Sequence, residues 1–161
     1  MPGAGKSTIG VLLAKTLGLS FIDTDLLIQL KSGRLLQEII DRDGVRAFLA
    51  VEEDILLRLE VERSLIATGG SAVYSEPAME HLRRLALIVY LRLDLAEVER
   101  RIKNITARGI AMAAGQSLAE LYAERVPLYE KYADVVFDCT ERQIEESVGA
   151  IALISAAYLG R

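Results

Sequence analysis

The first eight residues of the chain have the types and spacing of a phosphate-binding loop. They read Met-Pro-Gly-Ala-Gly-Lys-Ser-Thr, which matches the second half of the pattern G-x-x-x-x-G-K-[ST]. Glycine lets the backbone approach a phosphate closely, and the N–H groups of a following helix attract anions. The pattern therefore predicts that this loop binds the phosphates of a nucleotide.

Two side chains of the loop would do most of this work. Lys6 is placed to contact the β- and γ-phosphates, and Ser7 to ligate Mg²⁺. A helix is predicted over residues 6–17, because apolar residues recur on one face and Gly18 ends the pattern. The predicted nucleotide-binding residues of this segment are Gly3, Ala4, Gly5, Lys6, Ser7 and Thr8.

A pair of carboxylates, Asp23 and Asp25, follows a short apolar run. Residues i and i+2 of a strand share a face, so both can point toward the loop. One could hold Mg²⁺ while the other accepts a proton from a substrate hydroxyl. Capping of the next helix is an alternative role for Asp23 or Thr24.

Composition narrows the classes of function. The chain has 161 residues, 52% of them hydrophobic, and a net charge of −4, which suits one α/β domain over residues 1–161. The absence of a basic cluster argues against nucleic-acid binding, and no apolar stretch has the length of a membrane span. Without a secretory signal, we expect a cytoplasmic, monomeric enzyme. Single residues, His81 and Cys139, do not make a metal or disulfide site.

Short apolar runs alternate with helical patterns, which is typical of a parallel sheet covered by helices. We predict strands over residues 20–22, 64–68, 85–91 and 135–138. We predict helices over residues 6–17, 24–31, 35–42, 45–62, 76–83, 95–104, 118–132 and 141–159. Residues 105–117 show little periodicity and are expected to be a mobile lid segment.

The strand that normally precedes a phosphate-binding loop is not among these elements. Such a strand lies in the middle of the sheet, and without it two central strands keep unpaired edges. About five buried apolar side chains at roughly 1.5–3 kcal/mol each would be lost. The sequence therefore predicts that the natural gene product starts upstream of Met1, or that the chain is marginally stable.

Taken in order, the motifs resemble those of the shikimate kinases, small P-loop kinases. The resemblance runs over nearly all of the chain. The family's G-x-G-K-S-T-x-G appears at residues 3–10 and its F-x-D-x-D at 21–25. Its G-G-G appears as Gly-Gly-Ser at 69–71, its R-P-L-L as Arg-Gly-Ile-Ala at 108–111, and its R-x-x-x-Y at 125–129.

The resemblance implies an α/β three-layer P-loop kinase fold, with a parallel sheet of order 2-3-1-4-5 that here lacks strand 1. It implies ATP and Mg²⁺ as cofactors, with Ser7 and Asp23 at the metal. Asp25 would bind the acceptor hydroxyl and take its proton, and Arg108 would reach the phosphates. The remaining implied contacts are Arg101 with adenine, and Gly69, Gly70 and Arg125 with the acceptor. For Arg101 and Arg125, a solvated helix face is the alternative.

The acceptor site departs from the family pattern. The family has G-E-x-x-F-R-x-x-E, and this chain keeps Gly44, Phe48 and Glu52 but has Leu49 in place of the arginine. Arg46, three residues earlier, is a possible substitute. Ser71 adds a hydroxyl, and Gly109 in place of proline predicts a looser hinge. The changes predict altered acceptor specificity.

Three functions are therefore open. The first is ATP-dependent phosphorylation of a small hydroxylated acid, with shikimate as the family's substrate. The second is a kinase for another alcohol, such as gluconate or an amino-acid alcohol, which Leu49 favours. The third is a non-catalytic nucleotide-binding protein. Retention of Asp25, Arg108 and Arg125 speaks against the third, because a binder needs none of them.

Overall fold

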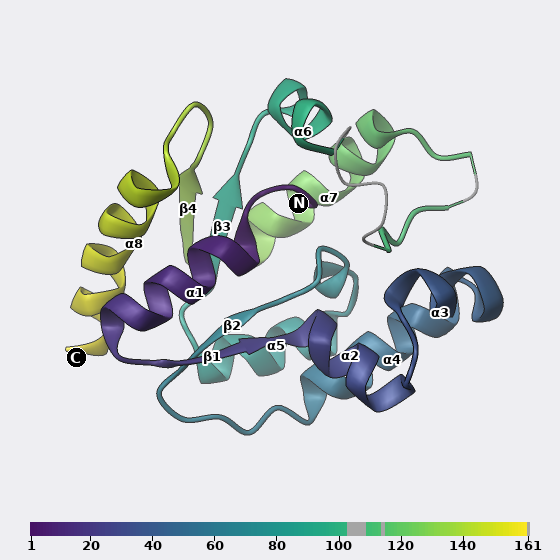
Figure 1. Cartoon of the computed structure of the whole chain (residues 1–161), viewed down its shortest axis with the longest axis horizontal. Helices are drawn as coiled ribbons and strands as arrows, with labels where there is room; N and C mark the ends of the chain where they lie inside the picture. Colours follow the sequence, from purple (N-terminus) through teal and green to yellow (C-terminus); the bar gives the residue numbers. More distant parts are fainter. Residues whose placement is uncertain (103–108, 114, 161) are drawn as a thin grey trace.

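Helices alternate with short parallel strands in the structure, a computed structural model that describes residues 1–102, 109–113 and 115–160. Figure 1 shows the arrangement. The elements are α1 (Lys6–Leu17), β1 (Ser20–Asp23), α2 (Thr24–Ser32), α3 (Leu36–Asp43), α4 (Val45–Leu57), β2 (Ser64–Ala67), the 3₁₀ helix η1 (Ala72–Tyr74), α5 (Glu76–Leu85), β3 (Val89–Arg92), α6 (Leu95–Ile102), α7 (Leu118–Tyr132), β4 (Val135–Asp138) and α8 (Ile144–Leu159).

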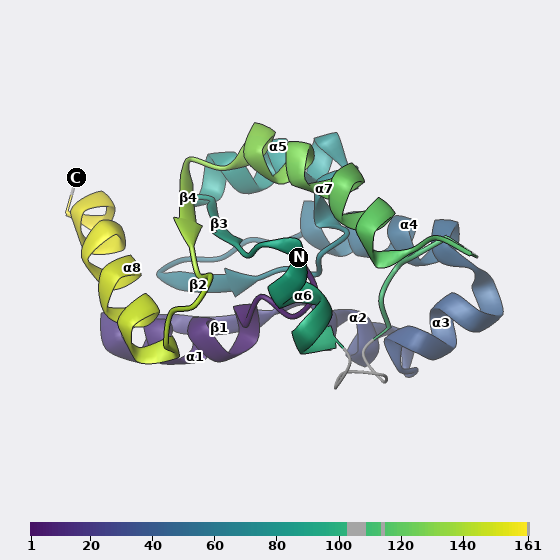
Figure 2. The same ribbon diagram turned by 90° about the horizontal axis from the view of Figure 1, so that it is seen from above.

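The strands form two parallel pairs. In the first pair, β1 lies beside β2 with Ser20 opposite Ser64; in the second, β3 lies beside β4 with Val89 opposite Val135. Within the described residues, β2 pairs only with β1, and β3 only with β4. Figure 1 shows the two pairs as separate arrows that run in different directions. Helix α1 packs on β1 and β2 and lies beside α8, whereas α5 and α7 lie on the opposite side of the strands (Figure 2).

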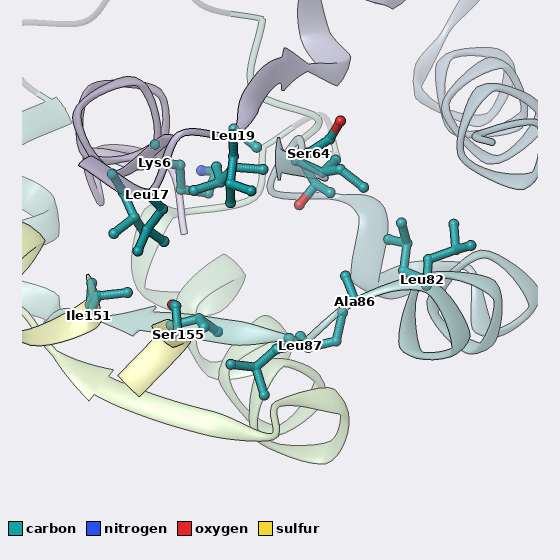
Figure 3. Close-up of a pocket in the computed structure, with 18 of the residues that line it drawn as sticks. Lys6, Leu17, Leu19, Ser64, Leu82, Ala86, Leu87, Ile151 and Ser155 are labelled. Carbon is teal, nitrogen blue, oxygen red and sulfur yellow. The ribbon is translucent and has the colours of Figure 1, made fainter. Parts of the chain in front are cut away.

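An apolar cavity of about 290 Å³ separates the two strand pairs. Its walls come from β2, β3, α1, α5 and α8, and Figure 3 shows side chains from these elements converging on it. The labelled residues are Lys6, Leu17, Leu19, Ser64, Leu82, Ala86, Leu87, Ile151 and Ser155.

The hydrophobic core has two parts. The larger cluster includes Ile9, Leu13 and Tyr90 and reaches α5, α7 and α8. The smaller one joins α2, α3 and α4, which are grouped at one end of the molecule in Figure 1. Its buried members are Ile28, Leu36, Ile39, Phe48, Ile55 and Ala111. Helices α2 to α4 therefore form a small unit with its own core beside the phosphate loop.

Most predicted elements are confirmed, and three boundaries are wrong by three or more residues. Helix α4 ends at Leu57, not at residue 62, although the apolar pattern continues to the buried Leu59. Strand β3 begins at Val89, because Leu85 is the last residue of α5. Helix α8 begins at Ile144 rather than at residue 141. The predicted lid, 105–117, lies partly outside the described residues. Among those that are described, we find no helix with the length and apolar character needed to cross a membrane.

Candidate active site

The loop before α1 has the backbone conformation that its glycines predict. Gly3 and Gly5 have φ angles of +74° and +82°, in the left-handed region that residues with a Cβ rarely adopt. Gly5 is the N-cap of α1, and Ala4 is buried beneath the loop. Ser7 and Thr8 are exposed on the first turn of the helix. The loop thus presents the positive end of the α1 dipole to a ligand.

Lys6 is the cation at the centre of the site. Its Nζ donates a hydrogen bond to the Met1 carbonyl oxygen, at 2.9 Å. Burial lowers the pKa of Lys6, while the negative charge of Asp25 acts in the opposite direction. The guanidinium of Arg125 also lowers the pKa of Lys6, so the two cations lie near one another. Such a concentration of positive charge suits a phosphorylated or carboxylated ligand.

Ser7 and Asp23 meet at the mouth of the loop. The Ser7 hydroxyl donates to Asp23 Oδ2 at 2.7 Å, while Asp23 Oδ1 accepts the Asp25 N–H at 3.0 Å as the N-cap of α2. Asp23 therefore caps α2, the alternative role given for it, and also pairs with Ser7 at the loop; its place at the metal stays a prediction. Hydroxyl and carboxylate oxygens fit Mg²⁺, which usually keeps several waters and phosphate oxygens as its other ligands.

Asp25 lies in the first turn of α2 and points toward the segment after β2. A Cβ built on Gly69 would lie 2.9 Å from Asp25 Oδ1, so the absence of a side chain there is needed for the approach. The Gly69 N–H donates to the buried Thr24 hydroxyl at 3.2 Å. The backbone donor that the resemblance assigned to the acceptor at Gly69 is therefore engaged inside the protein.

Arg125 is the largest fully buried side chain among the described residues, with 1% of it exposed. The solvated helix face considered from the sequence is therefore wrong for this arginine. Its Nε donates to the Tyr74 hydroxyl at 3.0 Å, and its Nη2 donates to the Ala111 carbonyl at 2.6 Å. Nη1 lies 3.1 Å from where a Gly70 Cβ would be. The Gly70 carbonyl in turn accepts from the Tyr129 hydroxyl at 2.6 Å.

Arg101 crosses the phosphate loop from α6. Its Nη1 donates to the Gly3 carbonyl at 3.3 Å, and its Nε pairs with Glu97 at 2.6 Å. A solvated helix face is wrong here too, because only 27% of the side chain is exposed. Arg108, the arginine predicted to reach the phosphates, lies outside the described residues.

Helix α4 carries Leu49 and Glu52, the two positions of the family's acceptor motif, and both line one pocket. Leu49 is partly buried against the smaller core cluster. Arg46 is exposed and does not line the 210 Å³ pocket beside Leu49 and Glu52; that it takes the place of the family's arginine stays a prediction. Glu52 is 2% exposed, and no partner is found for its Oε1 among the described residues. From the sequence, Glu52 was only a residue that this chain shares with the family pattern. The replacement of the family's arginine by Leu49, one turn earlier, was the signal that could have drawn attention to Glu52.

Gly109 lies against the start of α3. Its φ is +52°, and a Cβ there would lie 2.6 Å from Leu36 Cβ and 2.9 Å from the Gln37 backbone nitrogen. Proline fixes φ near −65° and cannot adopt this conformation. The glycine therefore allows a close contact with the start of α3, and a looser hinge at this position stays a prediction.

The comparisons with known proteins agree on one family. A family model described as shikimate kinase matches residues 2–154. The chain belongs to the shikimate kinase family. A shikimate kinase of Mycobacterium avium is 40% identical over 147 residues, which are 88% of this chain and 82% of that protein. One of Thermobifida fusca is 33% identical over 153 residues, covering 94% and 88%. Members of this family are phosphotransferases that act on a hydroxyl of shikimate.

Solved structures show the same relationship. Shikimate kinase from Acinetobacter baumannii in complex with shikimate has a TM-score of 0.88 and 28% identity, covering 97% of this chain and 89% of that one. The enzyme from Aquifex aeolicus has a TM-score of 0.76 and 26% identity, covering 98% and 94%. The fold is therefore the α/β P-loop kinase-like fold of the shikimate kinases.

Proposed function

We propose that the protein transfers the γ-phosphoryl group of ATP to a hydroxyl of shikimate and forms shikimate 3-phosphate. The observation that carries the proposal is the convergence of Lys6, Asp25 and Arg125 from three helices on one buried cluster. A base, a phosphate-binding cation and an acceptor-binding cation are what such a transfer needs. The family relationship supports the same reaction.

On the nucleotide side, the loop N–H groups and Lys6 would hold the phosphates, and the α1 dipole adds to their effect. Ser7 and Asp23, already 2.7 Å apart, would hold Mg²⁺. When bound, this ion neutralises charge that develops on the phosphate oxygens. Arg101 would pack against the adenine, since it lies over Gly3. Arg108 stays a prediction for the transferred phosphoryl group.

On the acceptor side, Asp25 would accept the proton of the attacking hydroxyl. Its carboxylate lies at Gly69 and near Lys6, between the two substrates. Lys6 would place positive charge next to the oxygens that become more negative, which is where electrostatic stabilisation has most effect. Arg125 would bind the acceptor carboxylate, with Gly70 beside its Nη1. Exchange of the Ala111 carbonyl for that carboxylate would free Nη2 for a second bond.

An assay of ADP formation with a panel of acceptors tests the proposal. Purified protein with Mg²⁺ and ATP is given shikimate, gluconate, other polyols or amino-acid alcohols. We expect shikimate to give the highest kcat/KM. A higher value with another alcohol would favour the second function, for which Leu49 is the specific observation. Tight ATP binding without transfer to any acceptor would contradict both.

We also propose that the sheet has the order 2-3-1-4-5, with β1, β2, β3 and β4 as strands 2, 3, 4 and 5. The two parallel pairs and the apolar cavity between β2 and β3 support this order. An extended apolar segment between them would pair with both edges. Each apolar side chain buried there would contribute roughly 1.5–3 kcal/mol.

A fusion tests the sheet proposal. Five alternating valine and isoleucine residues and a glycine loop are added ahead of Met1, and thermal unfolding is compared with that of the chain without this extension. We expect the melting temperature to rise by about 10 °C or more. The added strand should contribute several kcal/mol of unfolding free energy, and each kcal/mol raises the melting temperature by about 2–4 °C in a chain of this size. An unchanged melting temperature would contradict the proposed strand order.

We also expect the protein to be a cytoplasmic monomer.

A further inference from the structure

Glu52 is the buried acid of the acceptor side that the transfer reaction does not use. It lies on α4 with 2% of its surface exposed, and its Oε1 has no hydrogen-bond partner among the described residues. Buried polar atoms nearly always have a partner in native proteins, and an exception calls for an explanation. A ligand that supplies the partner is one such explanation.

The position of Oε1 ties it to the acceptor side. A Cβ built on Gly69 would lie 2.2 Å from Glu52 Oε1 and 2.9 Å from Asp25 Oδ1. The proposed base and the unpartnered oxygen therefore approach the same backbone position from α2 and α4. A substrate bound at Asp25 would come within reach of Glu52.

Glu52 is surrounded by both polar and apolar side chains. A pocket of about 210 Å³ opens next to it and is lined by Leu49, Ser71 and Tyr74, among others. Leu49 lies three residues before Glu52, on the same face of α4. In the family pattern that position is an arginine, which would carry charge to this place. In this chain the carboxyl group of Glu52 can form hydrogen bonds at that place.

The charges that face Glu52 come from several elements. Burial is the main cause that raises the pKa of Glu52, to about 7, and the negative charge of Asp25 on α2 adds to it. A hydrogen bond from Ser71, Arg125 on α7 and Lys6 on α1 lower the pKa. The Tyr129 hydroxyl on α7 also lies near enough to interact with Glu52.

We propose that Glu52 is a specificity-determining residue of the acceptor site, and that its neutral carboxyl group donates a hydrogen bond to a carboxylate or hydroxyl oxygen of the acceptor. The inference rests on the proposed function and names a contact for that site. Above pH 7, acceptor binding then requires uptake of one proton by Glu52. The dissociation constant of an anionic acceptor rises with pH and approaches a tenfold increase per pH unit.

Calorimetry of shikimate binding in the presence of Mg²⁺ and ADP tests this directly. At pH 8, buffers of different ionisation enthalpy report the protons that binding takes up. We expect uptake approaching one proton in the unchanged protein and less than half of that in Glu52→Gln, whose amide donates without titrating. In that variant the shikimate dissociation constant should change less than about threefold between pH 7 and 8.5.

Glu53→Gln is the matched control. Glu53 is the next residue of α4, and its carboxylate already accepts from the Ser75 hydroxyl at 2.5 Å. It should keep the proton uptake and pH dependence of the unchanged protein. A merely structural Glu52 would alter the melting temperature in Glu52→Gln and leave the uptake as it was.

The outcomes separate this inference from the proposed function. Shikimate binding and turnover without proton uptake, or uptake that Glu52→Gln retains, would overturn the inference alone. Failure of shikimate to bind or to be phosphorylated at any pH would overturn the proposed function, and the inference with it.

Discussion

The phosphate side and the acceptor side of the site differ in how completely their polar groups are paired. On the phosphate side, Ser7 bonds Asp23, Lys6 bonds the Met1 carbonyl and Arg101 bonds Gly3 and Glu97. On the acceptor side, Glu52 keeps an unpartnered oxygen, and Leu49 stands where the family has arginine. The polar groups of the loop are therefore paired within the protein, whereas the proposed acceptor side departs from the family pattern at Leu49.

The two sides also lie on different elements. The residues of the proposed phosphate side lie on α1, the end of β1 and α6. Those of the proposed acceptor side lie on α4, α7 and the segment after β2. Substitutions on one side should therefore leave binding on the other nearly unchanged. Lys6 and Asp25, which interact across the boundary, are where both substrates should be affected.

Lys6→Ala should have the largest effect on kcat/KM for ATP, because it changes both kcat and KM. The loss of a preorganised cation at the phosphates should lower kcat by at least about a hundredfold and raise the KM for ATP. Steady-state kinetics in both substrates measure this. Lys15→Ala, an exposed lysine on the same helix, is the control and should behave as the unchanged protein. Near-normal turnover in Lys6→Ala would remove Lys6 from the reaction.

Asp25→Asn should come next. Without a general base, kcat should fall by about 10²–10⁴-fold, while the ATP dissociation constant changes little. Single-turnover kinetics together with an ATP-binding titration separate the two effects. Asp41→Asn, at an exposed position of α3, is the matched control. A variant at position 25 that turns over normally would show that another group takes the proton.

Leu49→Arg should sharpen the contrast by restoring charge to the acceptor side. A charge-assisted bond contributes about 1.5–3 kcal/mol, so the KM for shikimate should fall by about tenfold, with the KM for ATP unchanged. Leu30→Arg, at a leucine that is 82% exposed on α2, controls for the added charge. An unchanged or higher shikimate KM in Leu49→Arg would mean that position 49 does not face the acceptor.

Gly10→Ala should have the smallest effect on kinetics and a clear one on stability. A Cβ there would lie 2.7 Å from Phe21 Cε2 and 3.1 Å from Leu65 Cδ2, so α1 would be pushed away from β1 and β2. Overpacking of this kind costs about 1–3 kcal/mol of unfolding free energy, which urea denaturation measures. Gly149→Ala, where nothing lies within 4 Å, is the control. Equal stability of the two variants would contradict the packing described.

Much of the fold could be predicted because local signals and tertiary contacts agree. Helix α7 runs over the predicted residues, since Ser117 and Glu120 form a capping box at its start. The predicted end of α4 was wrong because Leu59 is buried outside the helix. An apolar pattern does not tell whether a buried residue is helical. The start of β3 was wrong for the same reason, since Leu85 extends α5.

The residues of the site also differ in how far the sequence could predict them. The glycines, Lys6, Ser7 and the aspartates are close in sequence, so their spacing indicated their chemistry. The engagement of the Gly69 N–H by Thr24, and the φ of +52° at Gly109 against α3, depend on contacts between distant segments. The unpartnered oxygen of Glu52 likewise follows from the burial of α4, and only Leu49 hinted at it.

Product analysis tests the central claim most directly. The protein is incubated with Mg²⁺, ATP and shikimate, and phosphorus NMR follows the phosphate signals, with Asp25→Asn in parallel. The account predicts a phosphate monoester of shikimate that grows in step with ADP and is nearly absent with Asp25→Asn. ATP that stays unchanged, or ADP that forms with free phosphate and no ester, would contradict it.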